Sequence, residues 1–178
     1  MVYTCCLLLA LNLLLPPVHC LLGNGCQEDE AIKRDLSLYD KAGPFSLDVS
    51  ASREVRRRTE AQAREFLWDH WHHRKRGYLT FTDHSIEGEP STSSFFIEPD
   101  EKGAWRVSVT IRRTLFARGE RKGKWQEHRE YCSYSIGRIR IPTDGLTPRQ
   151  TIPDNEKTPP QAYLLVFKDA RGEVIAEF

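Results

Sequence analysis

The chain has 178 residues, with 26 lysines and arginines against 25 aspartates and glutamates. Its net charge of +1 gives no overall attraction to nucleic acid or to an anionic membrane. Hydrophobic residues make up 39% of the chain and charged residues 29%, which excludes an intrinsically disordered protein and predicts one globular domain with its own core. The charge is uneven, because residues 53–140 hold 19 lysines and arginines but only 13 aspartates and glutamates.

The N-terminus carries an apolar run over residues 5–15, which Pro16 and Pro17 end. The run is shorter than the roughly 20 residues that span a bilayer, but it matches the hydrophobic region of a secretory signal peptide. Small residues precede Cys26 at the positions that a signal peptidase requires. We therefore predict a signal peptide over 1–25 and an extracytoplasmic protein that is secreted, periplasmic or membrane-anchored. The segment before the run lacks lysine and arginine, which leaves an uncleaved anchor or a cytosolic chain as alternatives.

Cys26 supports two further hypotheses. It can be the lipidated first residue of a bacterial lipoprotein, although Gly23 stands where such sites usually have leucine. Alternatively, cleavage leaves Cys26 and Cys132 as the only cysteines, and an oxidising compartment allows them to form a disulfide. The sequence does not give their separation, so both hypotheses stay open. Membrane contact is expected only through the signal or a lipid anchor.

Residues 26–52 are polar and are predicted to form an extended leader, with a short strand possible at 45–49. A single α+β domain is predicted over 53–178. It begins with a long helix, because Ser52 suits the N-cap and no proline or glycine follows before Gly77. Gly77 is the expected C′ residue of this helix.

One face of the predicted helix is apolar. At about 100° per residue, this face collects the following side chains: Val55, Thr59, Ala63, Phe66, Leu67 and Trp71. The helix ends in the histidine-rich stretch "WDHWHHRKRG" at 68–77. His70 falls in the middle of the apolar face, whereas His73 lies at its edge and His72 points away.

The three histidines therefore do not form one cluster, and no metal site is predicted. His70 and Trp71 are candidate binding residues on the face that covers the sheet. His70 is also a weak candidate for a general base or ligand, assisted by Asp83 or His84. The other interpretation of His70 is a core or helix-end histidine with a backbone partner.

After Gly77, apolar and polar residues alternate with a period of two, which predicts consecutive β-strands. These strands are expected over 78–86, 91–98, 104–116 and 125–141. Within the last of them, Ile136 and Ile139 have opposite parity, so a β-bulge is predicted at Gly137. A proline-rich loop follows over 142–162, and a final hairpin over 163–178 is expected to dock on the sheet.

The turn at 117–124 is strongly basic. Arg121, Lys122 and Lys124 at this hairpin tip are candidate binding residues for an acidic partner or an anionic surface. The glycine spacing and the strand that follows exclude a phosphate-binding loop. Nucleic acid is not an expected partner, because Trp105 is assigned to the core rather than interleaved with these cations. No cofactor is predicted.

The elements predict an α+β fold in which one long amphipathic helix packs on a curved antiparallel sheet of about five or six strands. The element order resembles the cystatin-like and NTF2-like cone folds, in which a curved sheet wraps a helix. That resemblance covers element order alone. It implies a helix–sheet cavity, toward which His70 would point.

The sequence contains no motif typical of catalysis. It favours a small exported, non-catalytic binding module that takes an apolar or amphipathic small molecule in the cavity, or a protein partner at the basic hairpin. One alternative is a small cone-fold enzyme that uses His70 as a general base or ligand. Another is an envelope-associated lipoprotein anchored at Cys26.

Overall fold

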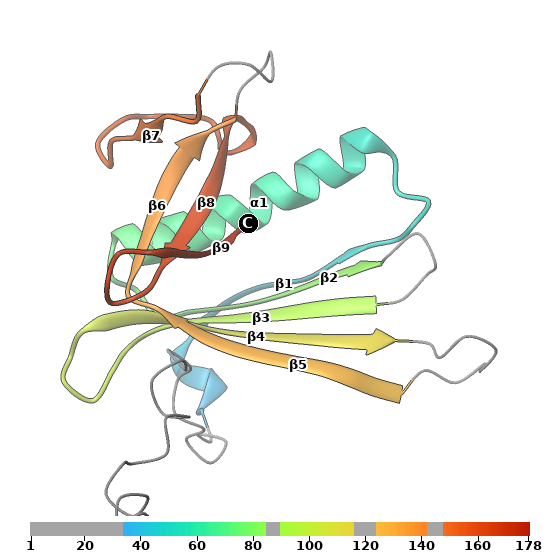
Figure 1. The fold of residues 1–178 in the computed structure, drawn as a ribbon, viewed down its shortest axis with the longest axis horizontal. Coiled ribbons are helices and arrows are strands. Elements are labelled where there is room, and N and C mark those ends of the chain that lie inside the picture. The colour runs from blue at the N-terminus through green and yellow to red at the C-terminus, as the bar shows by residue number, and fades with distance from the viewer. Residues whose placement is uncertain (1–33, 85–89, 116–123, 142–147) are drawn as a thin grey trace, which may run out of the picture.

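A computed structural model describes residues 34–84, 90–115, 124–141 and 148–178 as two sheets and one long helix (Figure 1). The elements in chain order are η2 (Leu36–Leu38), β1 (Asp40–Leu47), α1 (Arg53–His72), β2 (Gly77–His84), β3 (Pro90–Pro99), β4 (Trp105–Leu115), β5 (Lys124–Ser133), β6 (Ser135–Arg140), β7 (Thr151–Ile152), η3 (Pro160–Ala162), β8 (Tyr163–Lys168) and β9 (Val174–Glu177). The predicted α+β fold, with one helix packed on a sheet, is confirmed.

The first sheet has the strand order β1-β2-β3-β4-β5 and is antiparallel from β2 to β5. Strand β1 differs, because it pairs parallel to β2, with Asp40 beside Gly77 and Leu47 beside Asp83. A parallel pair needs a long crossover connection, and α1 provides it. The described part of the predicted leader thus contributes η2 and an edge strand to the domain.

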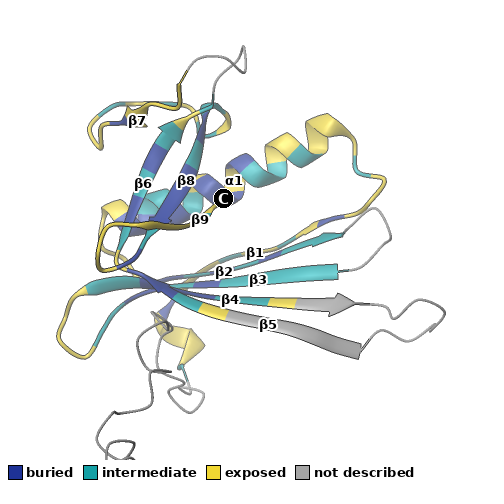
Figure 2. Cartoon of the chain, viewed as in Figure 1, coloured by how far each residue is buried: buried dark blue, intermediate teal, exposed yellow. Residues whose placement is uncertain are grey.

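A second sheet has the order β7-β6-β8-β9. The predicted final hairpin forms β8 and β9, and it pairs with β6 rather than extending the first sheet. One buried cluster joins α1 to both sheets, and its members include Leu67, Trp71, Leu79, Phe81, Phe95, Ile97, Ile136, Tyr163, Leu165 and Phe167. Figure 2 shows buried residues where α1 passes the second sheet, whereas the N-terminal half of α1 is largely exposed. Among the described helices, none combines the length and hydropathy that a membrane span requires.

The predicted strand over 125–141 is divided between the two sheets. Strand β5 ends at Ser133, β6 begins at Ser135, and the exposed Tyr134 lies between them. The pairing of β6 with β8 is continuous across Gly137, so the predicted bulge at Gly137 was wrong. The prediction assumed that Ile139 faces the core, but Arg138 occupies the buried position in its place. An arginine is tolerated there because its guanidinium stacks on aromatic rings.

The helix begins as predicted, with the Ser52 Oγ accepting a hydrogen bond from the Val55 N–H at 3.3 Å. It ends earlier than predicted, in a Schellman motif without glycine. The Arg74 N–H donates to the Trp71 carbonyl at 3.3 Å, and the Lys75 N–H donates to the His70 carbonyl at 2.9 Å. Arg74 adopts the left-handed conformation there, with a φ of 52°.

Gly77 therefore has a role other than ending the helix. It lies in β2, and a Cβ atom at this position would lie 2.9 Å from the Cδ2 atom of His70. The glycine is needed because α1 and β2 approach each other closely at this point.

We expect the positive φ of Arg74 to cost stability, since a side chain with a Cβ atom is disfavoured in this region. Arg74→Gly should be more stable than Arg74→Ala by about 1 kcal/mol, because both remove the guanidinium that lies 4.4 Å from the Trp71 ring but only glycine relieves the backbone. Urea unfolding of the two variants measures this difference. Equal stabilities would show that the backbone at residue 74 is not strained.

Candidate functional site

The structure places His70 in the core rather than in an open cavity. Its Nδ1 atom lies 2.9 Å from the Phe66 carbonyl, and its Nε2 atom lies 3.4 Å from the Asp40 carboxylate. The ring is buried, with its centroid 3.9 Å from that of Phe66. Trp71 is also buried, within the main cluster. These contacts match the alternative hypothesis for His70, a helix-end histidine with a backbone partner.

The proposed helpers of His70 are engaged elsewhere. Asp83 accepts two hydrogen bonds from Arg56 at 2.9 and 3.0 Å, and the His84 Nδ1 atom lies 2.8 Å from the Leu47 carbonyl. His72 stacks on Trp68 and also lies edge-on to the neighbouring His73 ring, with the two ring centroids 5.1 Å apart, whereas His70 contacts Phe66. No group of three potential metal ligands lies together within the described ranges.

The basic hairpin is only partly described. Arg121 and Lys122 lie outside the described residues, and Lys124 is described only through its backbone, which opens β5 opposite Leu115. Cys26 also lies outside the described residues, whereas Cys132 is buried in β5 with its Sγ atom 3.9 Å from the Ser108 Oγ atom. The basic site and the Cys26–Cys132 disulfide stay predictions.

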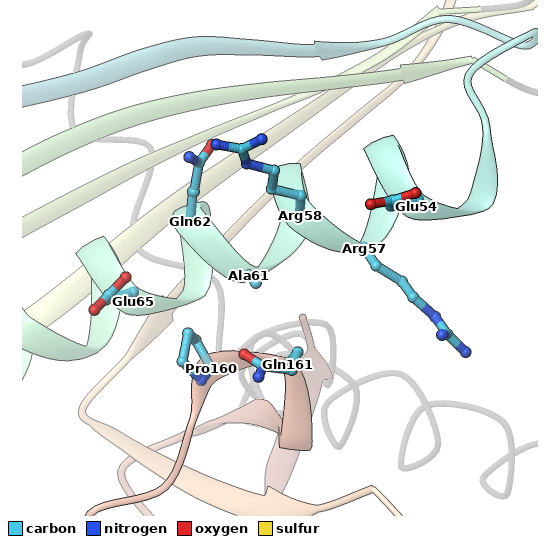
Figure 3. A pocket seen from close by; sticks show the side chains of 8 residues that line it. All are labelled: Glu54, Arg57, Arg58, Ala61, Gln62, Glu65, Pro160 and Gln161. Carbon is cyan, nitrogen blue, oxygen red and sulfur yellow. The ribbon is translucent and has the colours of Figure 1, made fainter.

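The structure reveals a groove between α1 and η3, on the side of the helix that faces away from the first sheet (Figure 3). This α1–η3 groove has a volume of about 410 Å³, and most of its lining surface is carbon. It is lined by Glu54, Arg57, Arg58, Ala61, Gln62, Glu65, Pro160 and Gln161. Ala61 is buried and faces Pro160 and Gln161. Figure 3 shows the Arg57 and Arg58 side chains pointing in opposite directions from the helix, with Glu65 further along it.

Two buried arginines hold the wall of the groove that η3 provides. The Arg64 Nε–H donates to the Pro160 carbonyl at 3.1 Å. Arg138 lies with its guanidinium 4.2 Å from the Trp68 ring centroid, and its Nη2 atom donates to the Pro153 and Glu156 carbonyls at 2.7 and 3.1 Å. These contacts hold residues 153–160 against the helix and so define the wall of the groove.

The sequence analysis missed this groove and its supports. Ala61 and Pro160 are about 100 positions apart, so no local pattern joins them, and the sequence does not distinguish Arg64 and Arg138 from arginines of the surface. The available signal was Ala61, a small residue on an otherwise charged helix face. Such a residue allows close approach of another segment.

A second polar cluster lies on the opposite side of the molecule, on the outer face of the first sheet. The Glu98 carboxylate accepts hydrogen bonds from Arg34 at 2.8 and 3.2 Å and from the Tyr39 hydroxyl, and Arg106 lies 3.6 Å away. Burial alone would raise the pKa of Glu98, but the hydrogen bonds from Arg34 and Tyr39 and the positive charges of Arg34 and Arg106 lower it below the usual 4.5. Burial and the Glu98 carboxylate raise the pKa of Tyr39 to about 12. This cluster anchors the segment before β1 to the sheet.

No protein-family model, curated protein or solved structure matches this chain. The groove is therefore identified as a candidate site from its geometry alone.

We expect Glu98→Gln to lower the free energy of unfolding at pH 7 by about 3 kcal/mol, because it leaves Arg34 and Arg106 without their buried countercharge. The folded pKa of Glu98 lies below the unfolded value, so the carboxylate stabilises the fold above pH 4.5 and this contribution is lost as the pH falls through the folded pKa. The gap between wild type and variant in urea unfolding should therefore narrow below pH 4.5.

The matched control is Glu101→Gln, the same chemical change at an exposed turn position. We expect this control to shift stability by less than about 0.5 kcal/mol. A Glu98→Gln penalty that does not change between pH 7 and pH 3 would contradict the role assigned to the carboxylate.

Proposed function

We propose that this protein is an exported, non-catalytic binding module whose α1–η3 groove takes a short segment of a partner protein. The observation that carries this proposal is a groove with a buried apolar floor at Ala61 and a rim of exposed polar side chains. Such a combination suits recognition, since the floor supplies contact area and the rim supplies orientation. The volume of about 410 Å³ lies within the range of roughly 300–1,000 Å³ that ligand sites occupy.

The groove replaces the helix–sheet cavity as the proposed site. Between α1 and the first sheet, Leu67, Leu79 and Phe95 pack in one cluster and are almost fully buried. Across the groove, by contrast, Gln62 and Gln161 are exposed, and each amide offers both donors and an acceptor. Side-chain amides of this kind match the donor and acceptor groups of a peptide backbone.

Export is proposed from the apolar run over 5–15, with a disulfide between Cys26 and Cys132 in the mature chain. Arg34 and Ser108 both contact Glu98, and Ser108 contacts Cys132. Cys26 is eight positions before Arg34, and an extended chain of eight steps reaches at most about 29 Å. Cys26 is therefore within reach of Cys132 along the chain. Lipidation of Cys26 is the competing modification.

The binding proposal is tested with random seven-residue peptides displayed on phage and selected on the exported protein. We expect one enriched family of peptides whose Kd rises at least about tenfold in Gln161→Trp, because the indole would occupy the groove. The control is Gln150→Trp, which places the same ring at an exposed glutamine outside the groove. Failure to enrich any peptide family, or equal loss of binding in both variants, would refute the proposal.

The export proposal predicts one intact mass for the protein purified from cells that secrete it. The mass should correspond to a chain beginning at Cys26 and two hydrogen atoms lighter than the fully reduced form. Reduction should restore those hydrogens, and Cys132→Ser should abolish the difference. An added mass the size of a lipid would contradict the disulfide and support lipidation of Cys26 instead. The mass of the full, uncleaved chain would contradict export with cleavage.

A further inference from the structure

The charges around the α1–η3 groove are separated along the helix. Arg57 and Arg58 lie in the N-terminal half of α1, and Glu65 lies about two turns further on (Figure 3). Glu54 adds one negative charge beside the arginines, while the nearby Arg53 adds one positive charge. The groove is therefore net positive at one end and negative at the other.

The arginines of the groove differ from the other arginines of α1 in their partners. Arg56 pairs with Asp83, and Arg64 lies 3.7 Å from Glu60. By contrast, no described residue forms an ion pair with Arg57 or Arg58, and both side chains are exposed. Their charges are thus available to a ligand.

The spacing of the two charged ends defines the length of the ligand. Seven or eight helical residues separate Glu65 from the two arginines, which corresponds to about 11–12 Å along the axis. An extended peptide rises about 3.3 Å per residue, so its charged side chains must be three or four residues apart. Between them, Ala61 and Pro160 offer an apolar surface to the intervening residues.

We propose that the groove binds an extended protein segment that carries an acidic side chain at the end made positive by Arg57 and Arg58, a basic side chain three or four residues away at Glu65, and an apolar residue between them. This inference rests on the proposed function, because it specifies the partner of the same groove. It commits to a segment of a protein, since a small anion would engage only one end.

To test this inference, the phage peptides enriched on the wild-type protein are sequenced, and the Kd of the most enriched peptide is measured. We expect opposite charges three or four positions apart with an apolar residue between them, and binding that weakens as salt rises. Arg57→Glu combined with Arg58→Glu should weaken this peptide at least about tenfold. A second peptide with lysine in place of its acidic residue should recover binding to that variant.

The control for net charge is Lys102→Glu combined with Arg171→Glu, which changes the protein charge by the same amount at two exposed turn positions. It should leave binding unchanged, and urea unfolding should show that both double variants stay folded. Enriched peptides without the opposite charges, or an equal effect of the two double variants, would overturn this inference. Gln161→Trp would still block binding in that case, so the proposed function would stand, whereas an absence of any enriched peptide would remove both.

Discussion

Helix α1 has to cover apolar residues of two sheets, and the arrangement of the molecule depends on this constraint. Leu67 and Trp71 belong to the cluster that includes Leu79 of the first sheet and Phe167 of the second. A sheet with one apolar face needs a covering layer, and α1 is the long helix that the described residues provide. The second sheet supplies the rest of the cover, which is why the chain leaves the first sheet at Tyr134.

Two sites built around a buried charged residue, Arg138 in one and Glu98 in the other, complete the packing on opposite sides of the core. Arg138 fixes the segment before η3 to α1 through carbonyl oxygens and aromatic rings, and Glu98 fixes the segment before β1 through Arg34. Each site leaves one polar atom without a hydrogen bond in the structure, the Nε of Arg138 and the Nε of Arg106. Burying a polar atom without a hydrogen bond costs free energy, and the other contacts of these two arginines have to offset that cost.

The sequence predicted the elements better than their assembly. Ser52 and the alternation around Val107 and Val109 are local signals, and the structure confirms the helix start and the strands that they predict. The parallel pairing of β1, the second sheet and the groove were missed, because they depend on contacts between distant segments. Arg138 shows the limit most clearly, since its type suggests exposure, and its burial depends on the Trp68 and Tyr163 rings and on carbonyl groups that are distant in sequence.

The position of Arg34 determines where the chain enters the described domain. Arg34 and η2 lie against the outer face of the first sheet, whereas the α1–η3 groove opens on the side of α1 away from that sheet (Figure 1). The chain therefore enters the described domain on the side opposite to the groove, so the segment around Arg34 and the groove occupy separate faces of the domain.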